Sequence, residues 1–521
     1  MIPGKRCGPP GVCAAGVCLL ASALAHAQLR VATWNVSNYD GTNRVADIKT
    51  AVYATYQGRS FAPDVIIGQE FISQAGVTAF LNALNTATGS PGDWAAAPFV
   101  DGPDTDSALF YRTSKVTLTD AYVVATGGAS PNHPRNIMRY TVRLKDYASD
   151  GGLLACYSTH MKAQETGSDD EARRLLEAQR IRDNAQTLSA QEHFLLGGDF
   201  NIQSSDEAAY QELVGSQANN GGRFFDPINT PGTWNNDSAY RYVHTQDPIG
   251  AGGMDDRYDQ LLVSGNLTDG DGFEYIGNAA LSYSTSTWND ANHSDRAWGN
   301  DGTSYNATLT ITGNQMVGAT IAQALVNVAT IAGGHLPVFM DLRVPPVVGA
   351  DASLDFGLVV QGSAAQAVLQ AWNEGNVARW NAAGIADLRY SLAASSGFGV
   401  PGGTFVDAAG GVANQHLLTM GTATPGLKTG TLTINSNAPD EPSRVVTLSG
   451  EVLAAQTMRG DANCDGRTDF DDINPFVLAL TGRSGYAATY PGCPWLNADC
   501  NGDNAVNFDD INPFVELLVS P

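Results

Sequence analysis

Positive charge is scarce in this chain. Its 521 residues include 29 Lys and Arg against 53 Asp and Glu, which gives a formal net charge of −24 and a pI of about 4.5. A field of that sign repels polyanions, so the composition argues against tight, sequence-specific binding of DNA. It does not exclude catalysis on phosphate esters, because metal ions and a few local arginines can invert the potential within a Debye length.

Long apolar runs are also few. One extends from Val12 to Ala25, follows Lys5 and Arg6, and ends in Ala25-His26-Ala27. This order of charged, apolar and small residues is typical of a cleavable secretory signal, and we expect cleavage after Ala27. No other segment approaches the ~18 apolar residues of a membrane span. We therefore expect an exported protein, soluble or held noncovalently at the cell surface; a retained N-terminal anchor is the alternative.

Cysteine is rare as well, with seven in the chain, three of which leave with the expected signal. Cys156 lies in an apolar run and is expected to be a buried thiol. Cys464, Cys493 and Cys500 cluster near the C-terminus. Export permits one disulfide among these three, with three possible pairings and one thiol left over.

The chain is longer than one hydrophobic core, since single cores seldom exceed ~250–300 residues. The composition changes after Val344-Pro345-Pro346 to Gly, Ala, Val and Thr in short alternating runs. We therefore predict a multidomain protein with a signal peptide at residues 1–27 and domains at residues 28–345, 346–455 and 458–521.

Several apolar runs in the first domain carry one polar group at an end. In Phe194 to Asn201, a buried strand is followed by Asp199 and Asn201, and two glycines are expected to let the chain turn there. Four runs end on such a group and two begin with one. If those two strands run antiparallel to the others, all the groups lie along one edge of a packed pair of sheets. The set is Asn35, Glu70, His160, Asp199, Asn201, Asp259 and His335.

Six short motifs between residues 29 and 345 resemble the endonuclease/exonuclease/phosphatase superfamily. This superfamily includes pancreatic-type DNases, abasic-site endonucleases, secreted sphingomyelinases and inositol polyphosphate phosphatases. The resemblance implies a DNase I-like, four-layered α/β sandwich and a metal-assisted attack of water on a phosphate ester. The motifs stand in the family's order: Thr33-Trp34-Asn35-Val36, Gln69-Glu70, Ser158-Thr159-His160, Gly198-Asp199-Phe200-Asn201, Tyr258-Asp259-Gln260-Leu261-Leu262-Val263 and His335-Leu336-Pro337-Val338.

The residue types also suit this chemistry. An enzyme that cleaves a phosphodiester must neutralise the nonbridging oxygens, activate a water in line and stabilise the leaving oxygen. Glu70 is expected to hold Mg²⁺ or Mn²⁺, and Asn35 to fix the metal shell or bind a phosphate oxygen. Asp259 is expected to orient His335 and to support its charged form during proton transfer.

The resemblance implies roles for the other residues. Asp199 orients or deprotonates the attacking water, Asn201 binds phosphate, and His160 is a second imidazole near the leaving group or the phosphate. The substrate class stays open among nucleic acid, a phospholipid head group and a small phosphodiester.

Two further residues are placed by position. Asp106 stands just before the strand-like run that begins at Ser107, where some DNase-like relatives carry an acid, and is expected to partner His160. Arg135 falls where relatives place a phosphate-binding arginine, and Arg139 and Arg143 compete for that role. A surface loop acid and surface charges are the alternatives.

The chain departs from the family at one position. The family usually has an Asp directly before the last His, whereas Gly334 precedes His335 here. Either the site works with fewer carboxylates, or Asp295 or Asp341 takes that place, or activity is weak or the metal choice is altered. The long segment between Val263 and His335 is interpreted as an irregular surface loop, with a substrate-selecting insertion as the alternative.

A helix is expected after Ser168. It carries four arginines among acidic residues, and Arg173 and Glu177 have i,i+4 spacing. This pattern predicts a solvated, internally paired face rather than a nucleic-acid surface.

The second domain lacks any catalytic set between Val347 and Leu453. Runs such as Thr429 to Asn437 and Val445 to Gly450 alternate apolar and polar residues between turn residues, as strands of a sandwich do. They resemble the Ig-like domains of the choice-of-anchor or ASPM-SPD-2-Hydin type, which implies an all-β spacer.

The C-terminal segment contains an internal repeat, because Phe470 to Val477 recurs identically at Phe508 to Val515. Each copy follows an acidic loop with oxygen-bearing residues at positions 1, 3, 5 and 12, the spacing of a calcium loop. The segment resembles a type I dockerin, a small α-helical domain that folds around two Ca²⁺ and docks onto a cohesin. A calcium-stabilised cap without a partner is the alternative. The expected ligands are Asp461, Asn463, Asp465 and Asp472, then Asp499, Asn501, Asp503 and Asp510.

Together these features predict a secreted, metal-dependent phosphoesterase with a spacer domain and a docking module. Within this class, they favour a DNase-like phosphodiesterase. The alternative is a non-catalytic extracellular assembly or adhesion protein, which Gly334 favours.

Overall fold

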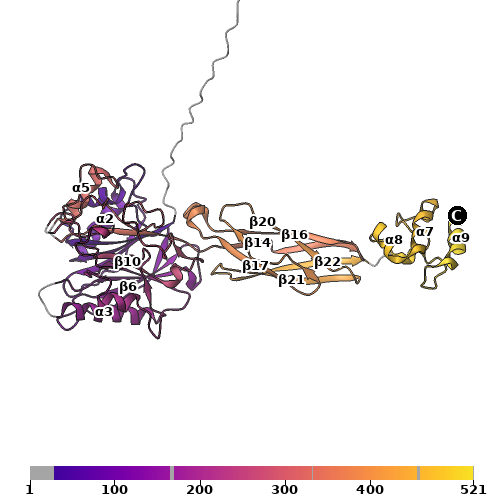
Figure 1. Ribbon diagram of the computed structural model, residues 1–521, viewed down its shortest axis with the longest axis horizontal. Coiled ribbons are helices and arrows are strands. Elements are labelled where there is room, and N and C mark those ends of the chain that lie inside the picture. Colours follow the sequence, from indigo (N-terminus) through magenta and orange to yellow (C-terminus); the bar gives the residue numbers. More distant parts are fainter. Residues whose placement is uncertain (1–27, 165–168, 251, 331–332, 454–457, 520–521) are drawn as a thin grey trace, which may run out of the picture.

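The computed structural model describes residues 28–164, 169–250, 252–330, 333–453 and 458–519. The expected signal segment, residues 1–27, lies outside the described residues. The chain forms an α/β region, then a β-rich region and then a small helical region (Figure 1). Among the described residues, no helix has both the length and the apolar character needed to cross a bilayer.

The α/β region contains two mixed sheets. At the centre of the first sheet, β1 and β2 are parallel, and the strands next to them, β13 and β4, run antiparallel. Across the sheet the order is β11 (Glu274–Tyr275), β13 (Val338–Arg343), β1 (Leu29–Tyr39), β2 (Val65–Phe71), β4 (Asp106–Arg112) and β3 (Trp94–Ala96), with β12 (Arg296–Ala297) also paired to β13.

In the second sheet, β7 and β8 form the parallel pair and the strands beside them run antiparallel. The strand directions predicted for Asp259 and His335 are confirmed, because β10 runs against β8 and β13 against β1. However, β13 begins only at Val338, since Pro337 has no N–H for a strand ladder. The order is β5 (Val116–Ala125), β6 (Ile137–Leu144), β7 (Leu153–His160), β8 (His193–Asp199), β10 (Asp259–Ser264) and β9 (Phe224–Phe225).

The sheets pack face to face over a shared apolar core that includes Val31, Leu154 and Leu195. Helices α1 (Val45–Tyr53), α2 (Gln74–Thr86) and α5 (Gly318–Ala329) cover the outer face of the first sheet. Helices α3 (Asp170–Ala185) and α4 (Ala208–Val214) cover the second, and Figure 1 shows α2 and α3 on opposite sides of the strands. The predicted four-layered α/β sandwich is confirmed.

The segment between Val263 and His335 is largely structural. Its helix α5 packs against α1, and Trp298 is buried in the same apolar cluster. His293 and Asp301 are buried as well. The prediction of an irregular surface loop is therefore wrong, because this segment supplies part of the helical layer over the first sheet.

The arginines of α3 do not form a solvated face. Arg174 and Arg182 are buried. Arg174 forms an ion pair of 2.5 Å with Glu207, and Arg182 donates to the main-chain carbonyls of Glu212 in α4 and of Gly215 just after it. Glu177 accepts a hydrogen bond from Thr159 on β7. The prediction of an internally paired face is wrong, since these side chains attach α3 to its neighbours.

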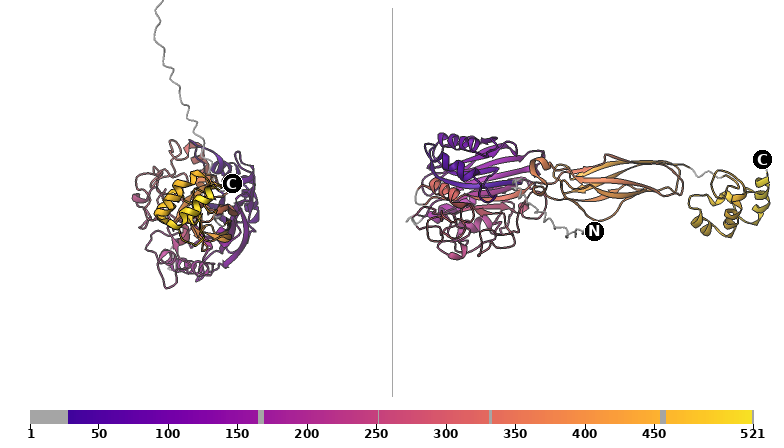
Figure 2. Two further views of the ribbon diagram at one scale, coloured as in Figure 1. Left: turned by 90° about the vertical axis from the view of Figure 1, so that its right-hand side faces the viewer. Right: turned by 90° about the horizontal axis from the view of Figure 1, so that it is seen from above.

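The β-rich region has two sheets that share one apolar core. One sheet consists of β14 (Val348–Ala350), β16 (Ala365–Asn373), β20 (Asn414–Met420) and β18 (Phe398–Gly399). The other consists of β15 (Ser353–Val360), β22 (Ser443–Leu453), β21 (Gly426–Ser436), β17 (Leu388–Ala394) and β19 (Phe405–Asp407). The right-hand view of Figure 2 shows the long strands extending side by side.

The change of architecture at Pro345 is not a break in packing. Trp380, at the end of α6 (Val377–Trp380), is fully buried in the apolar core that lies between the two sheets of the α/β region. The ammonium of Lys115 lies 4.4 Å from the Trp380 ring centre and donates to the main-chain carbonyl of Arg379. Asp440 accepts from two main-chain N–H groups, those of Ala148 and Ser149.

The C-terminal region contains α7 (Ile473–Thr481), α8 (Arg483–Thr489) and α9 (Ile511–Val519). A disulfide joins Cys464 to Cys493, which selects one of the three pairings left open by the sequence, and Cys500 is a buried free thiol. The expected buried thiol of Cys156 is confirmed.

Candidate active site

The polar strand ends meet at one edge of the sandwich. Asp199, the last residue of β8, lies opposite His160 of β7 on one side and Asp259 of β10 on the other. From the first sheet, Asn35 donates hydrogen bonds of 2.9 Å to Glu70 and 3.1 Å to Asp199. The two sheets thus contribute to one cluster, as the strand directions predict.

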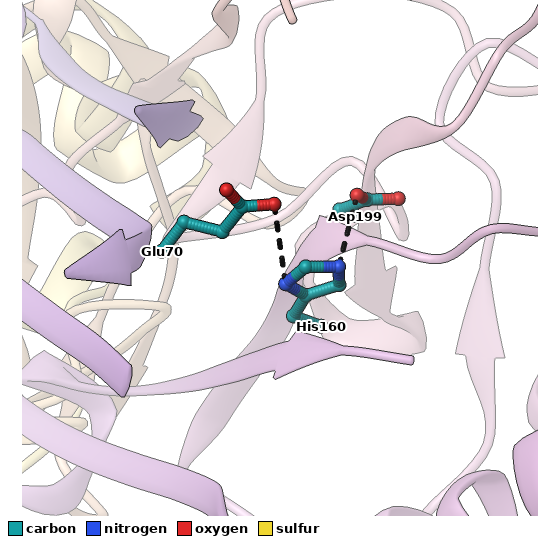
Figure 3. A group of neighbouring side chains, drawn as sticks. All are labelled: Glu70, His160 and Asp199. Carbon is teal, nitrogen blue, oxygen red and sulfur yellow. Dashed lines mark ion pairs between the residues drawn. The ribbon is translucent and has the colours of Figure 1, made fainter. Parts of the chain in front are cut away.

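The cluster contains three potential metal ligands. Glu70, His160 and Asp199 each offer an atom, and these atoms lie within 4.8 Å of one another. Figure 3 shows the His160 ring between the two carboxylates: Nδ1 lies 3.8 Å from Glu70 and Nε2 lies 3.3 Å from Asp199. Nδ1 of His160 is buried and has no hydrogen-bond partner among the described residues. The two carboxylates suit Mg²⁺ or Mn²⁺, whereas the imidazole nitrogen is a ligand that suits transition metals such as Zn²⁺.

This grouping differs from the expected one. It adds His160 and Asp199 to Glu70, while Asn35, which was expected to fix the metal shell, donates through its amide nitrogen to both carboxylates and accepts the N–H of Ser37 through its oxygen. Asn35 therefore orients the carboxylates, and His160 takes the third position of the metal cluster. The sequence placed His160 at this edge, but with an expected role near the leaving group or the phosphate rather than beside the metal.

An irregular backbone turns Glu70 toward the cluster. Its φ of +61° is uncommon for a residue with a side chain, and the pairing of β2 with β4 shifts register between Gly68 and Phe71. Such a bulge redirects a side chain that a regular strand would place on the opposite face. Strained backbone of this kind concentrates at functional sites, and Asn201 has a φ of +51°.

Gly197 and Gly198 do not form the expected turn, because both lie within β8. A Cβ on Gly198 would lie 2.0 Å from the carbonyl oxygen of Thr159, and one on Gly197 would lie 3.2 Å from the Cβ of Thr33. The glycines instead let β8 approach β7 and the opposite sheet closely.

The two imidazoles differ in charge. His335 makes a 2.7 Å hydrogen bond to Asp259 through Nδ1, and its Nε2 lies 3.3 Å from Asp199. Burial lowers the pKa of His335, but the Asp259 and Asp199 carboxylates outweigh the effect of burial and raise this pKa to about 10. Burial, together with the charges of Arg135 and His335, lowers the pKa of His160 well below its usual value. At neutral pH His335 is thus cationic, and His160 is neutral and able to bind a metal.

The pKa of Asp199, whose carboxylate lies between the two imidazoles, is also shifted. Burial raises the pKa of Asp199 to about 6, although the charge of His335 opposes this. Titratable groups whose pKa values are driven apart mark the acid and base assignments of a site. Without a bound metal, Asp199 therefore becomes ionised at about pH 6, beside an imidazolium that stays charged up to about pH 10.

Replacing Asp259 by Asn tests this electrostatic arrangement. The change removes the negative charge that raises the pKa of His335 most, so we expect this pKa to fall from about 10 toward the usual His value of ~6.5. The measurement is an NMR titration of the His335 ring. Asp199→Asn should lower the pKa of His335 by less. A His335 pKa that stays near 10 in Asp259→Asn would contradict the assignment of Asp259 as the main cause of the raised value.

Three other predicted residues lie near the edge with different partners. The Asn201 amide donates to the carbonyl of Met161. Asp106 is buried at the start of β4 and accepts the N–H of Gly102, so its expected hydrogen bond with His160 is not formed. Arg135 donates to the carbonyls of His160 and Met161 and pairs with Asp104 at 2.7 Å, which leaves its role in phosphate binding a prediction.

Neither proposed substitute occupies the place of the missing Asp at Gly334. Asp341 pairs with Arg30 at 2.7 Å, and Asp295 interacts with the buried Arg257. A Cβ on Gly334 would lie 2.6 Å from both the Cβ and the carbonyl oxygen of Ala329. The backbone around Ala329 therefore excludes a side chain at position 334.

Comparison with known proteins agrees with the motifs. Residues 32–289 match the model of the Endonuclease/Exonuclease/phosphatase family. No curated protein matches the chain.

Among solved structures, the chain is similar to the human Nocturnin catalytic domain with bound sulfate (14% identity, 60% of this chain, 94% of that chain, TM-score 0.35). It is also similar to D. rerio TDP2 complexed with single-strand DNA product (14% identity, 61% and 99%, TM-score 0.31). A third is beta toxin from Staphylococcus aureus (12% identity, 60% and 99%, TM-score 0.35). By the family match and the ordered motifs at one sheet edge, residues 32–289 form a domain of the Endonuclease/Exonuclease/phosphatase family.

Proposed function

We propose that the chain is a secreted phosphodiesterase that uses Mg²⁺ or Mn²⁺ to hydrolyse phosphodiester bonds. The observation that carries this proposal is the convergence of Glu70, His160 and Asp199 within 4.8 Å, beside the buried pair of His335 and Asp259. A bound divalent ion neutralises a nonbridging phosphate oxygen and makes water more acidic.

The side chains at the sheet edge have separate roles in this reaction. Asp199, which lies 3.3 Å from both His160 and His335, orients the attacking water and accepts its proton. His335, held cationic by Asp259, faces the negative charge that develops on the phosphoryl group. Asn35 fixes the Glu70 and Asp199 carboxylates, and Asn201 and Arg135 bind phosphate oxygens when substrate replaces their present partners.

A panel of substrates tests the proposal. Purified mature protein is incubated with DNA, RNA, bis-p-nitrophenyl phosphate and sphingomyelin, with Mg²⁺, Mn²⁺ or EDTA. We expect at least one phosphodiester to be hydrolysed with metal and none with EDTA, because the metal supplies the charge neutralisation. If none of these substrates is hydrolysed in a metal-dependent way, the result would favour the alternative function, a non-catalytic extracellular assembly protein. Gly334 is the observation that supports this alternative.

The β-rich region and the C-terminal region complete the proposal. We assign the first to an Ig-like domain at residues 346–455 and the second to a dockerin-like domain at residues 458–521 that binds two Ca²⁺. The support is that both acidic loops fold alike: Asp461 accepts the N–H of Asp465 at 3.1 Å, and Asp499 accepts the N–H of Asp503 at 3.1 Å. Position 12 of each loop, Asp472 or Asp510, is fully buried.

The carboxylate and amide oxygens of each loop are the ligand types that a hard cation such as Ca²⁺ takes. Phe470 and Phe508 are 72% and 78% exposed at equivalent positions of the repeat, which supports docking onto a cohesin-like partner. Calcium titration followed by tryptophan fluorescence of Trp495 tests the loops. Two binding events are expected. A fluorescence signal that does not change with Ca²⁺ would contradict the assignment of the two loops as calcium sites.

A further inference from the structure

The space between the two sheets changes in polarity toward the candidate site. Successive alternate residues of a strand face the same side. On β1 the inward residues are Leu29 and Val31, then Thr33, then Asn35. On β7 they are Leu154 and Cys156, then Ser158, then His160. Both strands thus pass from apolar to neutral polar and then to site residues.

The neutral polar level forms one hydrogen-bonded layer. Thr33 donates to the Gln69 side-chain oxygen Oε1 at 3.2 Å, the Gln69 side-chain Nε2 donates to Ser158 at 3.3 Å, and Ser158 donates to Ser107 at 2.8 Å. Gln69 and Ser107 belong to the first sheet and Ser158 to the second. We call these four residues, Thr33, Gln69, Ser107 and Ser158, the neutral layer; all are buried.

Gln69 is the centre of this layer. Its side chain is fully buried, and its amide also donates to the carbonyl of Ile67 at 3.1 Å, so both ends of the group are occupied. Apolar contacts between sheets are non-directional, whereas hydrogen bonds fix distance and angle. The bond from Gln69 to Ser158, together with those from Ser158 to Ser107 and from Asn35 to Asp199, therefore contributes to the alignment of the two sheets next to the site.

The alignment matters because the metal cluster draws on both sheets. Gln69 is the residue directly before Glu70, and Ser158 stands two residues before His160 on the same face of β7. Any sliding of one sheet over the other changes the separation of Glu70 from His160, which is 3.8 Å in this structure.

We infer that Gln69 is a positioning residue: through Ser158 it holds the Glu70 carboxylate at the distance from His160 and Asp199 that a divalent ion requires. This inference rests on the proposed function for its effect on turnover, but its effect on metal binding stands apart from turnover. Groups that hydrogen-bond metal ligands typically alter metal affinity or activity 10–100-fold when removed, and Gln69, which contacts no ligand itself, is expected to act at the lower end of that range.

The test compares Gln69→Met with Gln260→Met. Methionine keeps the length of the side chain and removes both hydrogen-bonding groups. Gln260 is a matched control, because it is 1% exposed, lies on β10 of the same sandwich and donates only to the main chain of Arg257. Mn²⁺ affinity is measured by calorimetry on the full chain with the C-terminal loops saturated with Ca²⁺, beside the melting temperature and the rate on bis-p-nitrophenyl phosphate.

We expect Gln69→Met to weaken Mn²⁺ binding and lower kcat by about 10-fold, with Gln260→Met close to the wild type. Ser158→Ala, a smaller change, should act in the same direction, and the double variant should fall short of the sum because both changes break one bond. Equal Mn²⁺ affinity in Gln69→Met and Gln260→Met would overturn the inference.

The outcomes separate the two proposals. If the wild type binds Mn²⁺ but hydrolyses nothing, the proposed function fails while the affinities still test Gln69. If the wild type binds no Mn²⁺ outside the C-terminal loops, both fail.

Discussion

Asp199→Asn is expected to lower metal-dependent turnover by about 10³-fold or more, since general-base catalysis alone contributes ~10²–10⁴. The substitution keeps the shape of the side chain and removes its charge. Asp199 contacts Asn35, His160 and His335 at 3.1–3.3 Å, so the loss affects the metal cluster and the proton acceptor together. The measurement is kcat and KM on the best substrate of the panel, with the melting temperature as a check on folding.

Asp295→Asn is the matched control for that experiment. Asp295 is a buried Asp whose pKa is raised to about 7 by burial, yet it interacts with Arg257 and lies outside the metal cluster. We expect its turnover to match the wild type. An Asp199→Asn variant as active as Asp295→Asn would remove Asp199 from the mechanism.

Trp380→Ala is expected to lower the free energy of unfolding of the α/β region by about 3–5 kcal/mol, the usual cost of truncating a buried aromatic residue. Trp380 belongs to the β-rich part of the chain but is fully buried in the core between the two sheets of the α/β region. Its loss opens a cavity there and removes the ring that Lys115 contacts.

The measurement is calorimetric unfolding of the full chain, followed by the same scan on a control. Trp495→Ala makes the same chemical change in the C-terminal region, where the ring packs against a separate cluster. The control should not change the temperature at which the α/β region unfolds. If Trp380→Ala does not change this temperature either, the β-rich region is an independent spacer.

The sheet edge could be predicted because strands impose a strict geometry. Each site residue stands at the end of an apolar run, and the direction of a strand decides at which edge that end lies. Asp259 and His335 were predicted to start strands that run against the others, and β10 and β13 do run that way. A pattern with a period of two and a known direction is enough for this inference.

Contacts between distant elements escaped prediction. Arg174 and Arg182 look like surface charges in the sequence, but they bind α4 and the chain after it, and no local spacing encodes that partner. Glu70 faces the site through a bulge whose φ of +61° has no sequence signature. The segment that carries α5 looked irregular because its apolar residues pack on α1, more than 250 residues earlier in the chain.

The disulfide and the neutral layer show two further limits. Three pairings were compatible with the cysteine positions, and only the fold brings Cys464 to Cys493. Gln69 and Ser158 each interrupt an apolar alternation, which is a visible signal, but their hydrogen bond joins two sheets whose relative alignment the sequence does not specify.

The most direct test of the account is anomalous scattering from crystals grown with Mn²⁺. We predict a peak among Glu70, His160 and Asp199, with oxygen ligands at roughly 2.0–2.2 Å, close to the distances at which Mg²⁺ is bound. A peak absent from this cluster, in crystals whose C-terminal loops contain metal, would contradict the central claim that this edge holds a catalytic divalent ion.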